Sequence, residues 1–203
     1  MTEKEHAWDK LLHIKTSGRD DSNADLFCYP YEPTPYAVLE RLAGTGLIGK
    51  KDVLVDYGCG KGRVGFFCSY QTKARTIGIE YDERIYLSAS ENEKTARSGN
   101  RTEFVLCRAE NYVIPADANR FYFFNPFSVD ILRQVMERIK ESYRNVPRDM
   151  LLFFYYPSDE YLAYLMDVEY LDIYDEIACG DLFDGNDMRE GIVIFSLAKE
   201  TEE

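Results

Sequence analysis

The stretch that most constrains the fold of this chain runs from Val53 to Phe67 and reads VLVDYGCGKGRVGFF. It begins with a short apolar run, as buried strands do, and continues with glycines at positions 58, 60 and 62. Glycine lets backbone amides approach a ligand because no side chain is in the way. A glycine turn between a strand and a helix N-terminus often holds the polar part of a nucleotide-like cofactor. The stretch therefore predicts a strand, a ligand-binding turn and a helix.

The rest of the chain alternates apolar segments with amphipathic ones. Strands are expected at 53–55, 75–80, 102–107, 120–124, 149–156, 168–177 and 191–198. Helices are expected at 3–14, 35–44, 63–71, 81–98 and 159–166, and after Ser128, with Thr34 as the cap of the second helix. The last two strands have no helix between them, which indicates an antiparallel pair. We expect an α/β fold with a doubly wound, mostly parallel seven-stranded sheet and a C-terminal antiparallel strand pair.

Composition limits the partners. The 203 residues are enough for one domain with a sizeable core, and the net charge of −12 should repel nucleic acid. The acidic residues are concentrated: from Ser158 to Asp187 there are ten carboxylates and no lysine or arginine. This run is either a solvated face or an acidic rim that recruits a basic substrate. Lys61, Arg63, Lys73 and Arg75 could still form one local basic edge.

The cysteines and histidines do not indicate a metal site. The five cysteines lack a CxxC spacing, and His6 and His13 have no third ligand nearby, so we expect free thiols and no bound metal. The charged N-terminus has no apolar signal region, and no run of 18 apolar residues occurs. We therefore expect a cytoplasmic protein that does not span a membrane.

Two cofactor classes compete for the glycine turn. Gly60 to Gly65 fits the G-x-G-x-x-G pattern with Glu80 about 20 residues on, which suits a nicotinamide or flavin dinucleotide. Asp56, however, stands at the end of the strand, where its carboxylate would face a pyrophosphate of like charge. A cofactor with cationic groups is a better electrostatic partner, and S-adenosylmethionine carries both a sulfonium and an ammonium.

The segment from Val55 to Gly62 resembles the D-x-G-x-G-x-G motif of class I, seven-strand S-adenosylmethionine-dependent methyltransferases, and 77–80 (IGIE) resembles their second motif. The resemblance implies a methyltransferase domain over 34–203, preceded by an N-terminal helix and a lid-like segment at 1–33. It also implies S-adenosyl-L-methionine as cofactor, held by Asp56, Gly58, Cys59, Gly60, Gly62, Glu80, Tyr81, Ala109 and Glu110. Many relatives have Gly-Asp-Ala after the third strand, whereas this chain has CRAE at 107–110.

The end of the fourth predicted strand carries a second motif. Asn125, Pro126 and Phe127 resemble, with one proline fewer, the N-P-P-(Y/F/W) motif of amino-group methyltransferases. That resemblance implies a catalytic role in which the amide and a carbonyl orient the target nitrogen and the ring stacks on the substrate. The alternative is a plain strand terminator, with Asn125 and Pro126 turning the chain.

A short P-T-P segment at 33–35 is similar to one in some small bacterial relatives and in seven-strand protein-lysine methyltransferases. It suggests that Tyr29 and Tyr31 contact the substrate, although a proline-rich turn can also be plain packing. The expected function is N-methylation of a protein side chain or a small amine, and a basic protein is one candidate acceptor. The alternatives are a nucleic-acid base N-methyltransferase and a non-catalytic cofactor-binding module.

Overall fold

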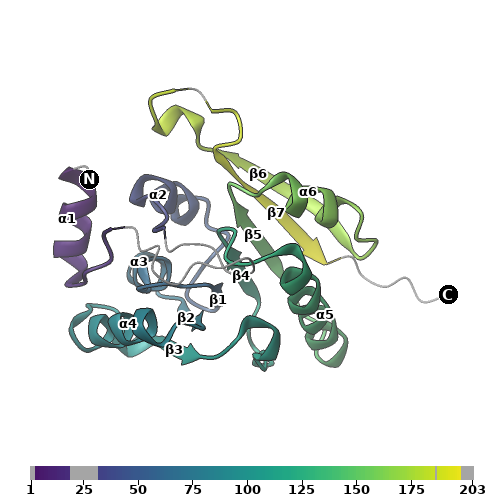
Figure 1. The fold of residues 1–203 in the computed structure, drawn as a ribbon, viewed down its shortest axis with the longest axis horizontal. Coiled ribbons are helices and arrows are strands. Elements are labelled where there is room, and N and C mark those ends of the chain that lie inside the picture. The colour runs from purple at the N-terminus through teal and green to yellow at the C-terminus, as the bar shows by residue number, and fades with distance from the viewer. Residues whose placement is uncertain (1–2, 19–31, 186, 198–203) are drawn as a thin grey trace.

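The computed structural model describes residues 3–18, 32–185 and 187–197 (Figure 1). Seven strands form one sheet in the order β3-β2-β1-β4-β5-β7-β6. Their bounds are β1 Val53–Tyr57, β2 Arg75–Glu80, β3 Thr102–Leu106, β4 Arg120–Phe123, β5 Leu151–Tyr155, β6 Leu171–Ala178 and β7 Gly191–Leu197. β1 to β5 are parallel, and β7 lies antiparallel between β5 and β6. The predicted sheet and its closing antiparallel pair are confirmed.

Helices cover both faces of the sheet (Figure 1). On one face α2 (Tyr36–Gly44), α3 (Arg63–Thr72) and α4 (Glu83–Thr95) share a core with the short N-terminal helix α1 (Glu3–Leu12). On the other face α5 (Val129–Asn145) and α6 (Asp159–Met166) share a second core. Short 3-10 turns lie at Gly99–Arg101, Ala109–Asn111 and Gly180–Leu182. No helix in the described ranges is long and apolar enough to cross a membrane.

Aromatic side chains fill the core under α5. The rings of Tyr57 and Phe123 stack at 5.1 Å between centroids, and those of Phe123 and Phe154 at 4.6 Å. These residues come from the adjacent strands β1, β4 and β5, with Tyr57 paired to Phe123 and Phe123 paired to Phe154 in the register. The stack therefore fixes the three strands beside one another where their carboxyl ends reach the pocket described below.

Several predicted boundaries were wrong. Thr34 does not cap α2; its hydroxyl shares a hydrogen bond of 3.0 Å with that of Tyr122, and Pro35 occupies the cap position without a side-chain bond. The helix expected at 81–98 begins at Glu83 because the carboxylate of Asp82 accepts from the first backbone amides of α4. β5 and β6 also begin two and three residues later than predicted, and each ends within one residue of the predicted range.

Arg63 anchors α1 to the rest of the fold. It stands in the first turn of α3 and is 2% exposed. Its guanidinium pairs with the carboxylate of Glu5, donates to Thr16 Oγ1 at 2.8 Å and to the Thr34 carbonyl at 3.2 Å, and stacks on the Tyr36 ring at 4.3 Å. A cation in the first turn of a helix is electrostatically unfavourable. The acidic α1 compensates for it, and Thr16 and Thr34 meet at the same guanidinium.

Asp9 completes this buried network. Its carboxylate accepts hydrogen bonds from the Tyr36 hydroxyl at 2.6 Å, the Thr16 hydroxyl at 2.7 Å and the Thr16 amide at 2.9 Å. Burial alone would raise the pKa of Asp9, but the hydrogen bonds from Tyr36 and Thr16 outweigh burial and hold the pKa below its ordinary value. The charged form of Asp9 therefore stabilises the folded chain.

We predict that Asp9→Asn lowers the free energy of unfolding at pH 7 by about 1–3 kcal/mol, because an amide nitrogen would face donors that are buried. A carboxyl group whose pKa is lowered by folding contributes stability above its unfolded pKa and loses it as pH falls through the folded value. The difference between the two proteins should therefore shrink below about pH 4. Urea denaturation at several pH values measures it. Glu3→Gln, an exposed acid on the same helix, is the control, and an equal loss in both variants would contradict the prediction.

Candidate functional site

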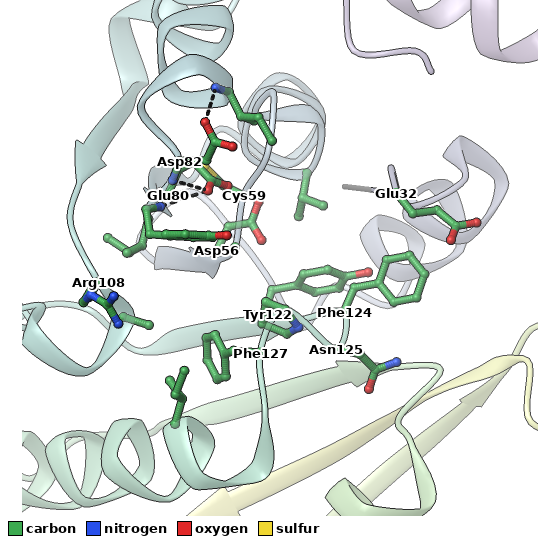
Figure 2. A pocket seen from close by; sticks show the side chains of 18 of the residues that line it. Glu32, Asp56, Cys59, Glu80, Asp82, Arg108, Tyr122, Phe124, Asn125 and Phe127 are labelled. Carbon is green, nitrogen blue, oxygen red and sulfur yellow. Dashed lines mark hydrogen bonds between the residues drawn. The ribbon is translucent and has the colours of Figure 1, made fainter. Parts of the chain in front are cut away.

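A pocket opens at the carboxyl ends of β1, β2 and β4, between the glycine turn and the loop after β4 (Figure 2). With its open mouth it encloses about 1050 Å³. In parallel α/β sheets, ligands bind at this edge. Most of the predicted site residues line the pocket: Asp56, Gly58, Cys59, Glu80, Tyr81, Ala109, Glu110, Asn125, Pro126 and Phe127. The topology thus brings together residues that are up to about 70 positions apart.

Gly60 and Gly62 do not line the pocket but shape the turn. The Gly60 amide donates to the Glu80 carboxylate at 3.0 Å. Gly62 has φ of 86°, and a Cβ there would lie 2.5 Å from the Phe104 ring. Gly58 has φ of 72°, and its Cβ would lie 2.3 Å from Pro126 Cβ. Both positions need glycine, because the left-handed backbone and the close neighbours exclude a side chain.

The Glu80 carboxylate holds the glycine turn against the end of β2. Besides the Gly60 amide, it accepts the amides of Tyr81 and Asp82, both at 2.9 Å. Burial raises the pKa of Glu80 even though these three bonds oppose the shift. One oxygen has two donors and the other has one, so capacity for one further donor remains. Asp82, which the sequence analysis did not select, also lines the pocket and adds a second carboxylate at this end.

Asp56 is a buried carboxyl group of the pocket with an unpartnered oxygen among the described residues. It lies at the end of β1, is 3% exposed, and within the described residues its Oδ2 has no hydrogen-bond partner. Burial, and secondarily the charge of Glu80, raise the pKa of Asp56 to about 8. A buried carboxyl group without a partner costs stability unless a ligand satisfies it. A cationic ligand in this pocket would both pair with Asp56 and favour its charged form.

Asn125 uses its amide to hold a neighbouring loop. Its Nδ2 donates to the Tyr156 carbonyl at 2.8 Å, and its Oδ1 accepts the Ser158 amide at 3.0 Å. Asn125 and Tyr156 both have positive φ, 40° and 45°, which is rare for residues other than glycine. The side chain is directed away from Asp56 (Figure 2). These contacts fit the strand-terminator interpretation, while Oδ1 keeps capacity for a second donor, and the catalytic role stays a prediction.

The segment at 107–110, the last of the predicted cofactor-binding segments, is partly engaged in contacts within the chain. Glu110 lies 3.6 Å from the Arg108 guanidinium, and its carbonyl accepts from Arg138. Tyr29 and Tyr31, the predicted substrate residues, lie outside the described residues, as does most of the lid-like segment. The pocket also contains residues that the sequence analysis missed: Glu32, Arg63, Asp82, Arg108, Tyr122 and Phe124. Phe124 and Tyr122 could have been found from their position at the end of a predicted strand beside Asn125.

The basic edge considered in the sequence analysis includes two arginines that are engaged in ion pairs. Arg63 is buried and ion-paired, and Arg75 bonds to Asp117 at 2.9 Å and Glu103 at 3.3 Å. Two of the four residues of the proposed basic edge are therefore already paired with carboxylates. In the part of the chain that the structure describes, no group of three or more His, Cys, Asp or Glu side chains could hold a metal ion.

Comparison with known proteins gives one curated relative. A protein-lysine N-methyltransferase of Saccharolobus islandicus (strain REY15A) is 32% identical over 72 residues, which is 34% of this chain and 45% of that protein. The match thus spans less than half of the relative's length. No protein-family model matches the sequence.

Solved structures resemble the chain more extensively. An RNA methyltransferase from Salinibacter ruber in complex with S-adenosyl-L-homocysteine has a TM-score of 0.57 at 19% identity, covering 85% of this chain and 97% of that one. A putative RNA methyltransferase from Pyrococcus horikoshii reaches 0.61 at 13%, with full coverage of both chains. Phosphoethanolamine N-methyltransferase 1 of Haemonchus contortus reaches 0.62 at 12%, covering 82% and 43%.

At these identities the likeness establishes architecture. The architecture of this chain is a mostly parallel seven-stranded sheet with the antiparallel strand β7 between β5 and β6, and the glycine turn follows β1. The chain has the fold of the class I, Rossmann-like S-adenosylmethionine-dependent methyltransferases.

Proposed function

We propose that this protein is an S-adenosylmethionine-dependent methyltransferase whose cofactor occupies the pocket beside the glycine turn. The observation that carries the proposal is Asp56, a buried carboxyl group with an unpartnered oxygen at the turn. A sulfonium and an ammonium would supply the missing positive partner, whereas a pyrophosphate would add repulsion. The neighbour from Salinibacter ruber, crystallised with S-adenosyl-L-homocysteine, supports the same cofactor class.

Different residues of the pocket would contact different parts of the cofactor. Asp56 would face the cationic part of the cofactor, and Glu80 and Asp82 at the end of β2 would accept from the ribose hydroxyls. The loop at Ala109 and Glu110 would border the adenine. When bound, S-adenosylmethionine supplies an electrophilic methyl group. The chain holds the acceptor in line with it, and such positioning alone can be worth roughly 7–11 kcal/mol.

For the acceptor we favour a nitrogen of a protein side chain or a small amine. Asn125, Pro126 and Phe127 line the pocket, which supports the acceptor role that the resemblance to amino-group methyltransferases implies. The curated relative is named for protein lysine, and one structural neighbour is named for phosphoethanolamine. A nucleic-acid base is the alternative suggested by the RNA methyltransferase neighbours, but the net charge of −12 and the paired state of Arg63 and Arg75 oppose it. In a non-catalytic module, Asn125 would be structural only.

Calorimetry tests the cofactor assignment. We expect S-adenosylhomocysteine to bind with a Kd in the micromolar range or below, which corresponds to about 8 kcal/mol, and NAD to bind at least 100-fold more weakly. Tight binding of NAD alone would overturn the proposal and restore the dinucleotide interpretation. Glu137→Gln, on the outer face of α5, should leave the affinity unchanged.

The state of Asp56 predicts a pH dependence. With its pKa raised to about 8, Asp56 is mostly neutral at pH 6 in the free protein and must lose a proton to pair with a cation. The affinity for S-adenosylmethionine should therefore rise between pH 6 and 7.5, by at most about tenfold per pH unit for one linked proton. S-adenosylhomocysteine, which lacks the sulfonium, should show a smaller rise. Calorimetry in buffers of different ionisation enthalpy measures the proton release directly, and Asp56→Asn should abolish it.

Asn125→Ala tests the acceptor assignment. We expect methyl transfer to fall by at least about 100-fold, as for loss of an orienting group, while affinity for S-adenosylhomocysteine changes less than about threefold. The variant also leaves the Ser158 amide without its acceptor, so urea denaturation is measured in parallel. Ser158→Ala, which removes the hydroxyl that caps α6, is the control for disturbance of this loop. Full turnover in Asn125→Ala would leave Asn125 with its structural role only.

A further inference from the structure

The side of the pocket opposite Glu80 has a carboxylate rim, which we define as Glu32, Asp159, Asp187 and Glu190. Glu32 lines the pocket directly and lies across Tyr122 and Phe124 from Asp56 (Figure 2). Asp159 begins α6 next to Ser158, whose amide is bonded to Asn125. The rim is thus adjacent to the place where an acceptor would meet the cofactor.

The other two members lie along the neighbouring strand ends. Glu190 accepts the Tyr155 hydroxyl at 2.8 Å, and Asp187 accepts the Tyr156 hydroxyl at 2.7 Å. Burial, and secondarily the hydrogen bond to Glu190, raise the pKa of Tyr155. The Phe124 ring packs on the Tyr155 ring at 4.6 Å and also lines the pocket. Carboxylates and aromatic rings therefore occur together on this side.

Between the start of β5 and the start of β7 the sequence carries one positive charge, Arg189, and it is already engaged. The sequence has no lysine or arginine from Asp149 to Met188. Arg189 follows, and its guanidinium bonds to Asp187 and stacks on the Tyr156 ring at 4.9 Å. Arg189 offsets the charge of Asp187, and the rim keeps a net negative charge from Glu32, Asp159 and Glu190. Such a field attracts cations and opposes a phosphate backbone.

We propose that the carboxylate rim selects a lysine side chain in a basic polypeptide segment as the methyl acceptor, with Glu32 and the Phe124 ring receiving its ammonium group. The inference rests on the proposed function and names its substrate class. A single small amine needs one counter-charge, whereas the rim spreads Glu32, Asp159 and Glu190, besides the Asp187–Arg189 pair, over the pocket mouth and the adjoining strand ends. Several cations on one chain match that spread. An aromatic ring face adds a cation–π contact to the ion pair.

The chemistry is balanced without a further reactant. The lysine ammonium first gives up one proton to water at the open mouth of the pocket. Its Nζ lone pair then forms a bond to the methyl carbon as the carbon–sulfur bond breaks, and that electron pair goes to sulfur. The products are a methylated ammonium group and S-adenosylhomocysteine. Glu32 favours the charged acceptor, so it contributes to binding and should affect KM more than kcat.

Two synthetic peptides test the inference. One is a nonapeptide with three lysines separated by glycines, and the other carries the neutral, equally long 6-hydroxynorleucine in their place. Binding is measured by fluorescence anisotropy with S-adenosylhomocysteine present. We expect the neutral peptide to bind at least tenfold more weakly. Glu32→Gln and Glu190→Gln should each lower the affinity for the lysine peptide about two- to fivefold, which is the range for a partly exposed ion pair.

Asp172→Asn is the matched control, since it removes one exposed carboxylate from β6 without touching the pocket. It should leave peptide binding unchanged. If Asp172→Asn and Glu32→Gln lowered the peptide affinity equally, the general negative field of the protein would explain the binding, and the rim would not. Equal binding of both peptides, or unchanged binding in Glu32→Gln, would overturn the inference. If N-acetyl-lysine methylamide bound as tightly as the nonapeptide, the polypeptide part would be wrong. Cofactor affinity is measured on the same samples. If the wild-type protein did not bind S-adenosylhomocysteine, that result would refute the proposed function instead.

Discussion

The site depends on one buried carboxylate that collects three backbone amides. Glu80 joins the glycine turn after β1 to the turn after β2, so two loops that are adjacent in space but 20 residues apart in sequence share one anchor. Without it, these amides would face the interior unpaired, and each would cost roughly 1–3 kcal/mol. The rigid shape of the glycine turn is therefore a property of the pair of loops and not of the glycines alone.

The buried ionisable groups differ in how well they are satisfied, and this difference separates structural from functional groups. Arg63 is enclosed by an ion pair, two hydroxyl or carbonyl acceptors and an aromatic ring, all provided by the chain itself. Asp56 lies in the same pocket with one oxygen unpartnered among the described residues. A fold keeps a charge of the first kind for its own stability, whereas a carboxyl group of the second kind stays protonated until a cationic partner from outside favours its charged form.

Local patterns in the sequence were enough for the sheet, the glycine turn and most of the pocket, because strand period, glycine spacing and strand order are short-range or topological properties. They failed where a distant residue decides. Thr34 has an ordinary capping position, but its hydroxyl bonds to Tyr122, 88 residues away. Arg63 looked like part of a basic edge until Glu5, 58 residues earlier, paired with it. Asn125 is a third case: the same short motif suits both a strand terminator and an acceptor-orienting group, and only its contacts with the loop after β5 show which bonds it makes.

The close approach of Gly58 and Pro126 links the two halves of the pocket. A Cβ at Gly58 would meet Pro126 Cβ at 2.3 Å, and the two residues belong to the proposed cofactor and acceptor loops respectively. Neither loop can change alone, because an atom added to one loop would have to be accommodated by a shift of the other loop. In evolutionary terms, a lineage that changes its methyl acceptor by altering the loop after β4 is expected to keep at position 126 a residue that leaves room for Gly58, because position 58 itself needs glycine.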